Sequence, residues 1–301
     1  MRGGRSRREA WQRVGFFLAF TTACSAVFWF LIIEAGRISA GHGLYITGLQ
    51  WCPGIAALVA RYRYEKTVRG LGWQWPPVRS QVLSYVIPIA YITPVYVITW
   101  MTGLGSLDES FLSDEKVAFG WSGLPDAIAL VFYVLVVGSV GMIQSSATAL
   151  GEEIGWRGFL VPELAKATGF TNVSLISGVA WATWHYPLFL YADYGAGPSR
   201  VVMMACFTIT VVGLSFLYAW MRLASGSLWS TTLLHASHNL FVENIFDPLT
   251  AGTASTRYIT GEFGAGLAAV SLIVALLCWR RRGQLPDRLT TNVGAITPRR
   301  T

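Results

Sequence analysis

Three apolar stretches of the sequence carry polar side chains that could do chemistry. These side chains are Glu152 and Glu153 in the run EEIGWR, His185 in WATWH, and His235, His238 and Asn239 in HASHN. Ionisable groups inside apolar segments are costly, so they often mark functional sites. A carboxylate or an imidazole can activate water, and imidazole and amide N–H groups can stabilise an oxyanion. The pattern therefore indicates hydrolytic chemistry, although isolated structural histidines could explain any single position.

Helical spacing separates the two glutamates. Glu153 and Arg157 are four residues apart, so they share a helix face and can form an ion pair, which we interpret as structural. Glu152 points roughly 100° away from Glu153, which leaves it freer to face a cavity. His235 and Asn239 are also four apart and share a face.

The composition indicates that these groups lie in a membrane protein. Of 301 residues, 53% are hydrophobic and only 13% are charged, about half the charged fraction usual in soluble domains. This argues against a soluble enzyme, a disordered chain and a secreted disulfide scaffold. The four cysteines have no paired spacing. We attribute the net charge of +7 to membrane topology and expect no nucleic-acid partner.

Eight segments are long and apolar enough to cross a bilayer, which takes about 20 residues. They are 14–33, 43–62, 82–101, 126–151, 172–191, 201–223, 227–246 and 261–279. The predicted fold class is all-α, a polytopic membrane helix bundle. We expect a membrane domain over residues 14–280, between a basic tail at 1–13 and another at 281–301. No internal repeat is apparent, and the longest loops, 63–81 and 102–125, hold no inserted domain.

The distribution of basic residues supports this count. With the first tail inside the cell, 19 of the 23 lysines and arginines fall in cytoplasmic segments. The other four are Arg37, Lys116, Arg200 and Arg257. Because basic residues concentrate in cytoplasmic loops, we expect both termini in the cytoplasm. The basic termini favour a bacterial plasma membrane over the endoplasmic reticulum.

The predicted spans also give a depth for each polar group. With a rise of about 1.5 Å per residue, Glu152, His235 and His185 would lie roughly 8, 12 and 20 Å from the cytoplasmic ends of their spans. We therefore expect one shared cavity in the cytoplasmic half of the bundle.

The three runs resemble the motifs of a known family. EEIGWR fits the EExxxR motif of the CAAX-protease and bacteriocin-processing (CPBP, or Abi) family of intramembrane endopeptidases. WATWH fits its second motif, an aromatic residue four positions before a histidine. Phenylalanine is commoner there than the tryptophan of this sequence, Trp181. HASHN fits its third motif, HxxxN. The resemblance covers about residues 124–246, and the other spans match only in being hydrophobic.

This resemblance implies a helical membrane protease with a site open to the cytosol. Its motifs assign Glu152 and His185 to water activation, and His235 and Asn239 to the oxyanion. They give Glu153 and Arg157 a supporting role. The implied partners are a peptide or protein substrate, with lipid modification left open, and membrane lipids. Oligomeric state is not implied.

The need for a cofactor stays open. No cofactor is certain, but a glutamate with two histidines could ligate a divalent metal such as zinc, through Glu152, His185 and His235. The extra histidine, His238, keeps that role open. The sequence contains no HExxH motif and no G-x-S-x-G elbow, which argues against a zincin and a serine hydrolase of that type.

Two other functions remain as alternatives. Polar groups on several spans also occur in ion-coupled transporters, although transporters often have repeated halves. A non-catalytic scaffold or bacteriocin-immunity protein would need the same fold without the hydrolysis.

Overall fold

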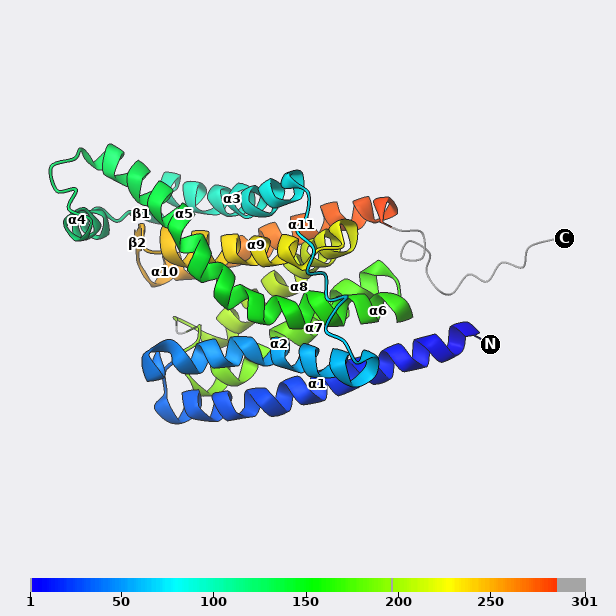
Figure 1. Cartoon of the computed structure of the whole chain (residues 1–301). Coiled ribbons are helices and arrows are strands. Elements are labelled where there is room, and N and C mark those ends of the chain that lie inside the picture. The colour runs from blue at the N-terminus through cyan, green and yellow to red at the C-terminus, as the bar shows by residue number, and fades with distance from the viewer. Residues whose placement is uncertain (1, 196, 286–301) are drawn as a thin grey trace.

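The computed structural model describes residues 2–195 and 197–285, so most of the predicted tail at 281–301 lies outside the described residues. The described chain is a bundle of long helices packed side by side (Figure 1). The long helices are α1 (Arg2–Ala35), α2 (Leu44–Glu65), α3 (Val78–Met101), α5 (Asp126–Glu153), α7 (Phe170–Tyr191), α8 (Arg200–Ser225), α9 (Leu228–Asn239) and α11 (Ala265–Arg280).

Shorter elements join these helices. Two π-helical segments, Ile154–Leu160 and Leu240–Phe246, directly follow α5 and α9. The remaining elements are α4 (Glu109–Ala118), α6 (Val161–Ala167), α10 (Ala254–Arg257), the 3₁₀ turns Ala40–Gly43 and Arg281–Gln284, and the strands β1 (Gly105–Leu107) and β2 (Thr250–Gly252).

The structure confirms the predicted helical membrane bundle. Each of the eight predicted spans coincides with one of the long helices. Five helical segments of the described chain are long and apolar enough to cross a membrane: Ser6–Ala35, Ala40–Glu65, Val78–Met101, Asp126–Ala167 and Arg200–Ser225. The count of eight spans stays a prediction.

The fourth predicted span ends too early. We placed its end at residue 151, but the helix continues through the π-helical segment into α6 and reaches Ala167. Glu152 therefore lies well inside a continuous helical segment rather than at its end. The predicted depth of Glu152 was counted from a span end at residue 151, so it is wrong.

The two ends of the bundle differ in the segments they carry (Figure 1). We call one end the basic end; it holds the start of α1, the loop 66–77, α6, the turn 226–227 and residues 280–285. The opposite end, the acidic end, holds residues 34–43, 102–126, 192–195, 197–200 and 243–264. Since every long helix connects these ends, the predicted up-and-down course of the chain is present.

The acidic end contains structure that the sequence did not indicate. In the loop 102–125, β1 pairs antiparallel with β2, with Ser106 opposite Ala251. Asp108 then caps α4, because its Oδ1 accepts the backbone N–H of Phe111 at 3.0 Å. This pairing joins the loop after α3 to the loop after α9.

A close crossing of α2 and α5 fixes the helix that carries the glutamates. A Cβ at Gly54 would stand 2.6 Å from the carbonyl oxygen of Gly151, and one at Gly155 would stand 2.7 Å from the carbonyl carbon of Pro53. Only glycine lets the two backbones approach this closely. Gly151 and Gly155 therefore allow this close packing. At Gly158 the nearest atom to a Cβ would be 3.4 Å away, an ordinary contact.

Candidate active site

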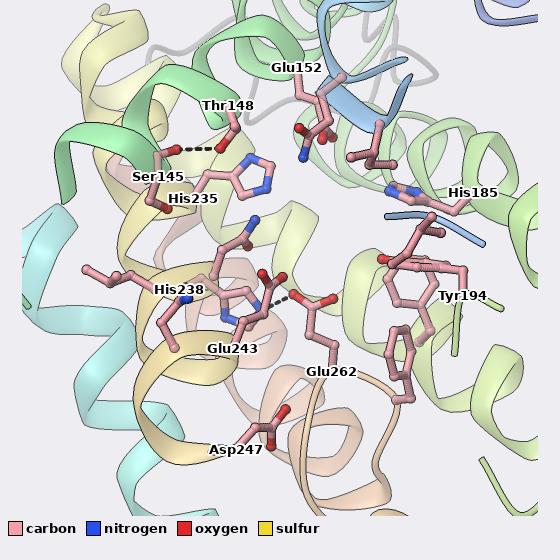
Figure 2. Close-up of a pocket in the computed structure, with 18 of the residues that line it drawn as sticks. Ser145, Thr148, Glu152, His185, Tyr194, His235, His238, Glu243, Asp247 and Glu262 are labelled. Carbon is pink, nitrogen blue, oxygen red and sulfur yellow. Dashed lines mark hydrogen bonds and ion pairs between the residues drawn. The ribbon is translucent and has the colours of Figure 1, made fainter. Parts of the chain in front are cut away.

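The predicted site residues share one cavity. This cavity has a volume of about 890 Å³ and is lined from α2, α5, α7, α8, α9 and the acidic end (Figure 2). Its lining includes every polar group of the three motifs that we expected to face a cavity: Glu152, His185, His235, His238 and Asn239. Helices far apart in the sequence thus bring a carboxylate, imidazoles and an amide together.

Glu152 is held by an indole. It is 3% exposed, and its Oε2 accepts a hydrogen bond from Trp181 Nε1 at 2.7 Å. A single donor occupies only part of the acceptor capacity of a carboxylate. Glu152 therefore has oxygen lone pairs left to accept a hydrogen bond from a water in the cavity.

His185 is oriented by the same residue. Its Nδ1 lies 2.9 Å from the carbonyl oxygen of Trp181. A carbonyl only accepts, so Nδ1 carries the proton, and in a neutral ring Nε2 is an acceptor. The ring is stacked on Tyr194, with centroids 5.6 Å apart. This leaves a fixed imidazole whose Nε2 can accept a proton.

The predicted ion pair of Glu153 and Arg157 is present. Arg157 donates to Glu153 Oε1 at 2.7 Å, and the two residues are 1% and 0% exposed. The guanidinium packs against the rings of Trp181 and Tyr218, 4.1 and 4.2 Å from their centroids. Such stacking stabilises a buried cation.

Glu153 also contacts the third motif. His235 Nδ1 lies 3.1 Å from Glu153 Oε1, so the supporting glutamate orients this imidazole. The ring of His235 packs edge-on against Trp181, with centroids 5.2 Å apart. The second glutamate of the first motif is therefore a structural link between α5 and α9.

His238 points to a different set of partners. Its Nδ1 is 2.7 Å from the hydroxyl of Tyr91, and its Nε2 is 3.5 Å from Glu262 Oε1 (Figure 2). Neither partner belongs to the three motifs. The extra histidine thus lines the cavity beside the motif residues, but its side-chain partners lie toward the acidic end.

Comparison with known proteins agrees with this geometry. Residues 123–241 match the family model of the type II CAAX prenyl endopeptidases, Rce1-like. A protein of Methanococcus maripaludis called CAAX prenyl protease 2 is 24% identical over 191 residues, 62% of this chain and 65% of that protein. Both matches support the resemblance of this chain to the CPBP family. The alignment thus spans about two thirds of the length of the curated relative.

The family match contains the whole constellation. The matched segment 123–241 runs from before α5 to just past Asn239, so it includes all three motifs. α1, α2, α3 and α11 lie outside the match. Helix α2 nevertheless contributes Gln50 to the cavity lining.

Metal binding is not supported by the arrangement of the side chains. Within residues 2–195 and 197–285, no group of three or more His, Cys, Asp and Glu side chains is placed to hold a metal ion. The residues considered for zinc, Glu152, His185 and His235, line one cavity without forming such a group. A metal requirement stays a prediction, and we derive no step through a metal.

Sequence analysis missed four carboxylates of the cavity: Asp193, Glu243, Asp247 and Glu262. Glu243 follows Asn239 by four residues, so the spacing that joined His235 to Asn239 could have found it. Glu262 lies in the loop before α11 and gave no signal. The carboxyl groups of Glu243 and Glu262 interact with each other.

The position of the cavity corrects one expectation. Its lining includes Ile38, Asp193 and Tyr194 at the acidic end, and none of the described residues that line it comes from the loop 66–77, α6 or the turn 226–227. The cavity therefore lies on the acidic side of Glu152. A cavity in the half that holds the termini, as predicted from the span ends, is wrong.

Proposed function

We propose that this protein is a membrane-embedded endopeptidase of the CAAX-protease type. The observation that carries the proposal is the meeting of Glu152, His185, His235 and Asn239 in one cavity, in the order of the family motifs. The substrate is a peptide or protein, with or without a lipid group. The basic end lies in the cytoplasm of a bacterial cell.

The attack on the peptide bond uses the two groups held by Trp181. A water between Glu152 and His185 Nε2 gives up a proton to one of them as its oxygen attacks the carbonyl carbon. A tetrahedral oxyanion forms. When it collapses, the C–N bond breaks, and the leaving nitrogen takes the proton from the group that received it. Water is consumed, and no oxidation occurs.

The oxyanion needs donors on the opposite side of the cavity. Asn239 has an amide NH₂ group that can donate to it. His235 already uses Nδ1 toward Glu153, so its Nε2 donates only when both ring nitrogens carry protons. Glu153 therefore contributes to the reaction through His235 as a positioning residue.

Cleavage by the purified protein tests the proposal. Wild type, Glu152→Gln and His185→Ala are incubated in detergent with a peptide library, with and without a chelator or added zinc. We expect cleavage by wild type and its loss in both variants, whose folding is checked by thermal unfolding. Glu115→Gln, in the surface helix α4, is the matched control and should cleave normally.

The same experiment separates the alternatives. Full activity of both variants would end the endopeptidase proposal. Ion flux into liposomes that depends on Glu152 would favour a transporter, and protection from a bacteriocin that survives both substitutions would favour an immunity protein. Loss of cleavage with chelator, restored by zinc, would assign a metal to the reaction.

Asn239→Ala tests the oxyanion assignment. Removing one oxyanion donor typically costs about 100- to 1,000-fold in kcat. We expect a loss of that size with little change in KM, because the interaction forms only in the transition state. An equal rate in the variant would show that Asn239 does not contact the developing charge.

A further inference from the structure

The basic end of the bundle is closed by a loop. The loop 66–77 crosses this end between α2 and α3 (Figure 1). Arg222, at the end of α8, donates to the carbonyl oxygens of Arg157 at 2.8 Å, Gly226 at 2.6 Å and Leu71 at 3.3 Å. One buried guanidinium thus joins the loop, the π-helical segment after α5 and the turn after α8.

Further hydrogen bonds attach the loop to the start of α9. The N–H of Leu228 donates to the carbonyl oxygen of Gly72 at 2.7 Å. Trp229 Nε1 donates to the carbonyl oxygen of Trp73 at 2.9 Å. The hydroxyl of Ser227 donates to the backbone carbonyl oxygen of Gln74 at 2.5 Å. These bonds hold the loop on the turn along four consecutive residues.

Packed side chains fill the space between this loop and the cavity. Leu71, Trp156 and Leu228 are 0–1% exposed. The buried pair of Glu153 and Arg157 lies in the same region. Because close-packed interiors leave few voids as large as a water, this layer separates the catalytic groups from the basic end.

The cavity continues instead to the acidic end. Its lining passes from Glu152 and His185 to Glu243, then to Asp193 and Asp247, whose side chains are exposed. Figure 2 shows Glu243, Asp247 and Glu262 on the side of the cavity away from Glu152. Water and a chain segment can therefore reach the motif residues from this end.

The charges of the two ends identify the compartments. Only four of the basic residues in the described chain lie at the acidic end: Arg37, Lys116, Arg200 and Arg257. By contrast, that end carries ten acidic residues: Glu34, Asp108, Glu109, Asp114, Glu115, Asp126, Asp193, Glu243, Asp247 and Glu262. An excess of arginine and lysine marks the cytoplasmic side, so the acidic end faces outward.

From the closed basic end and this charge asymmetry we propose that the cavity opens to the extracytoplasmic side. Its substrate is then a polypeptide presented there: a secreted chain or the outer segment of a membrane protein. Calling the occupant a substrate rests on the proposed function, but the side of entry does not. The cytosol-facing site implied by the family resemblance and cytoplasmic termini cannot both hold in this structure.

Labelling of single cysteines from one side of the membrane tests the proposal. Asn244→Cys reports on the cavity lining, where residue 244 is exposed. Gly123→Cys marks the acidic end and Gly283→Cys the basic end, and a Cβ at either glycine meets no atom within 4 Å. Intact spheroplasts of a bacterium that produces the protein are treated with a membrane-impermeant maleimide, beside wild type with its four native cysteines.

We expect Asn244→Cys and Gly123→Cys to be labelled in intact spheroplasts, and Gly283→Cys only after permeabilisation. Labelling of Gly283→Cys but not Gly123→Cys in intact cells would overturn the assignment of the compartments. The assignment of the opening would be overturned if Asn244→Cys were labelled only after permeabilisation, as expected for Gly283→Cys, or if it were labelled from neither side. Labelling needs no turnover, so adding Glu152→Gln leaves it unchanged, and failure here is distinct from failure of the proposed function.

Discussion

Trp181 contacts residues of all three motifs. Its indole N–H holds Glu152, its carbonyl oxygen holds His185, and its ring covers the guanidinium of Arg157. The aromatic residue of the second motif therefore does more than fill space. The hydrogen bond to Glu152 requires tryptophan, since phenylalanine, the commoner residue of the motif, has no N–H.

Trp181→Phe isolates that hydrogen bond, because it keeps an aromatic ring beside Arg157. Hydrogen bonds to charged groups contribute about 1.5–3 kcal/mol. We expect kcat/KM for peptide cleavage to fall about tenfold to a hundredfold, with the folded state retained. Trp184→Phe is the matched control: its N–H donates to Ser25, away from Glu152. Unchanged cleavage by Trp181→Phe would show that Glu152 is positioned without the indole.

Arg157→Met tests the buried ion pair. Removing one partner leaves Glu153 as an uncompensated charge, which typically costs about 3–5 kcal/mol of stability. We expect a large fall in the thermal unfolding temperature in detergent, partly restored in the double variant Glu153→Gln/Arg157→Met. A single variant as stable as wild type would mean that Glu153 is neutral or solvated without its arginine.

The spacing of residues predicted contacts within a helix and missed contacts between helices. The pair of Glu153 and Arg157 follows from their separation of four residues. The contact of Glu153 with His235 depends on how α5 packs against α9, which no local pattern encodes. For the same reason Glu262, in a loop before α11, could not be assigned to the cavity from the sequence.

At the scale of the elements, glycines decide where α5 lies. Gly155→Ala would place a Cβ 2.7 Å from the backbone of Pro53, whereas Gly158→Ala would meet nothing closer than 3.4 Å. Overpacking typically costs about 1–3 kcal/mol. We expect Gly155→Ala to lower the unfolding temperature and the yield of folded protein, and Gly158→Ala to leave both near wild type. Equal stability of the two variants would show that α2 can move away without cost.

The positions of the helices were predictable, and several of their ends were not. Long apolar runs identified all eight segments, because a bilayer demands about 20 apolar residues per helix. The polar run EEIGWR suggested an end at residue 151. There the helix instead continues through a π-helical segment, because Glu153 and Arg157 satisfy each other inside the bundle. The pairing of β1 with β2 joins residues about 145 positions apart, so periodicity could not show it.

At the scale of the whole molecule, the bundle is asymmetric along its long axis. The basic end is closed by a hydrogen-bonded loop over packed side chains, and the acidic end opens into the cavity. A hydrolytic site needs water and an extended peptide, and both can arrive through only one of these ends. The closed end is also the end whose excess of arginine and lysine predicts a cytoplasmic location.

Arg222→Gln tests whether the closure depends on that one guanidinium. Glutamine cannot reach all three carbonyl oxygens that Arg222 binds, and each buried acceptor left unpaired costs about 1–3 kcal/mol. In inside-out vesicles, where the basic end faces the reagent, we expect Asn244→Cys alone to resist an impermeant maleimide. With Arg222→Gln added, labelling should appear, because the loop 66–77 loosens and the cavity becomes open at both ends.

Arg280→Gln, at an exposed arginine of the same end, is the control and should leave the cysteine protected. Protection that persists in Arg222→Gln would show that the packed layer of Leu71, Trp156 and Leu228 closes this end without the arginine.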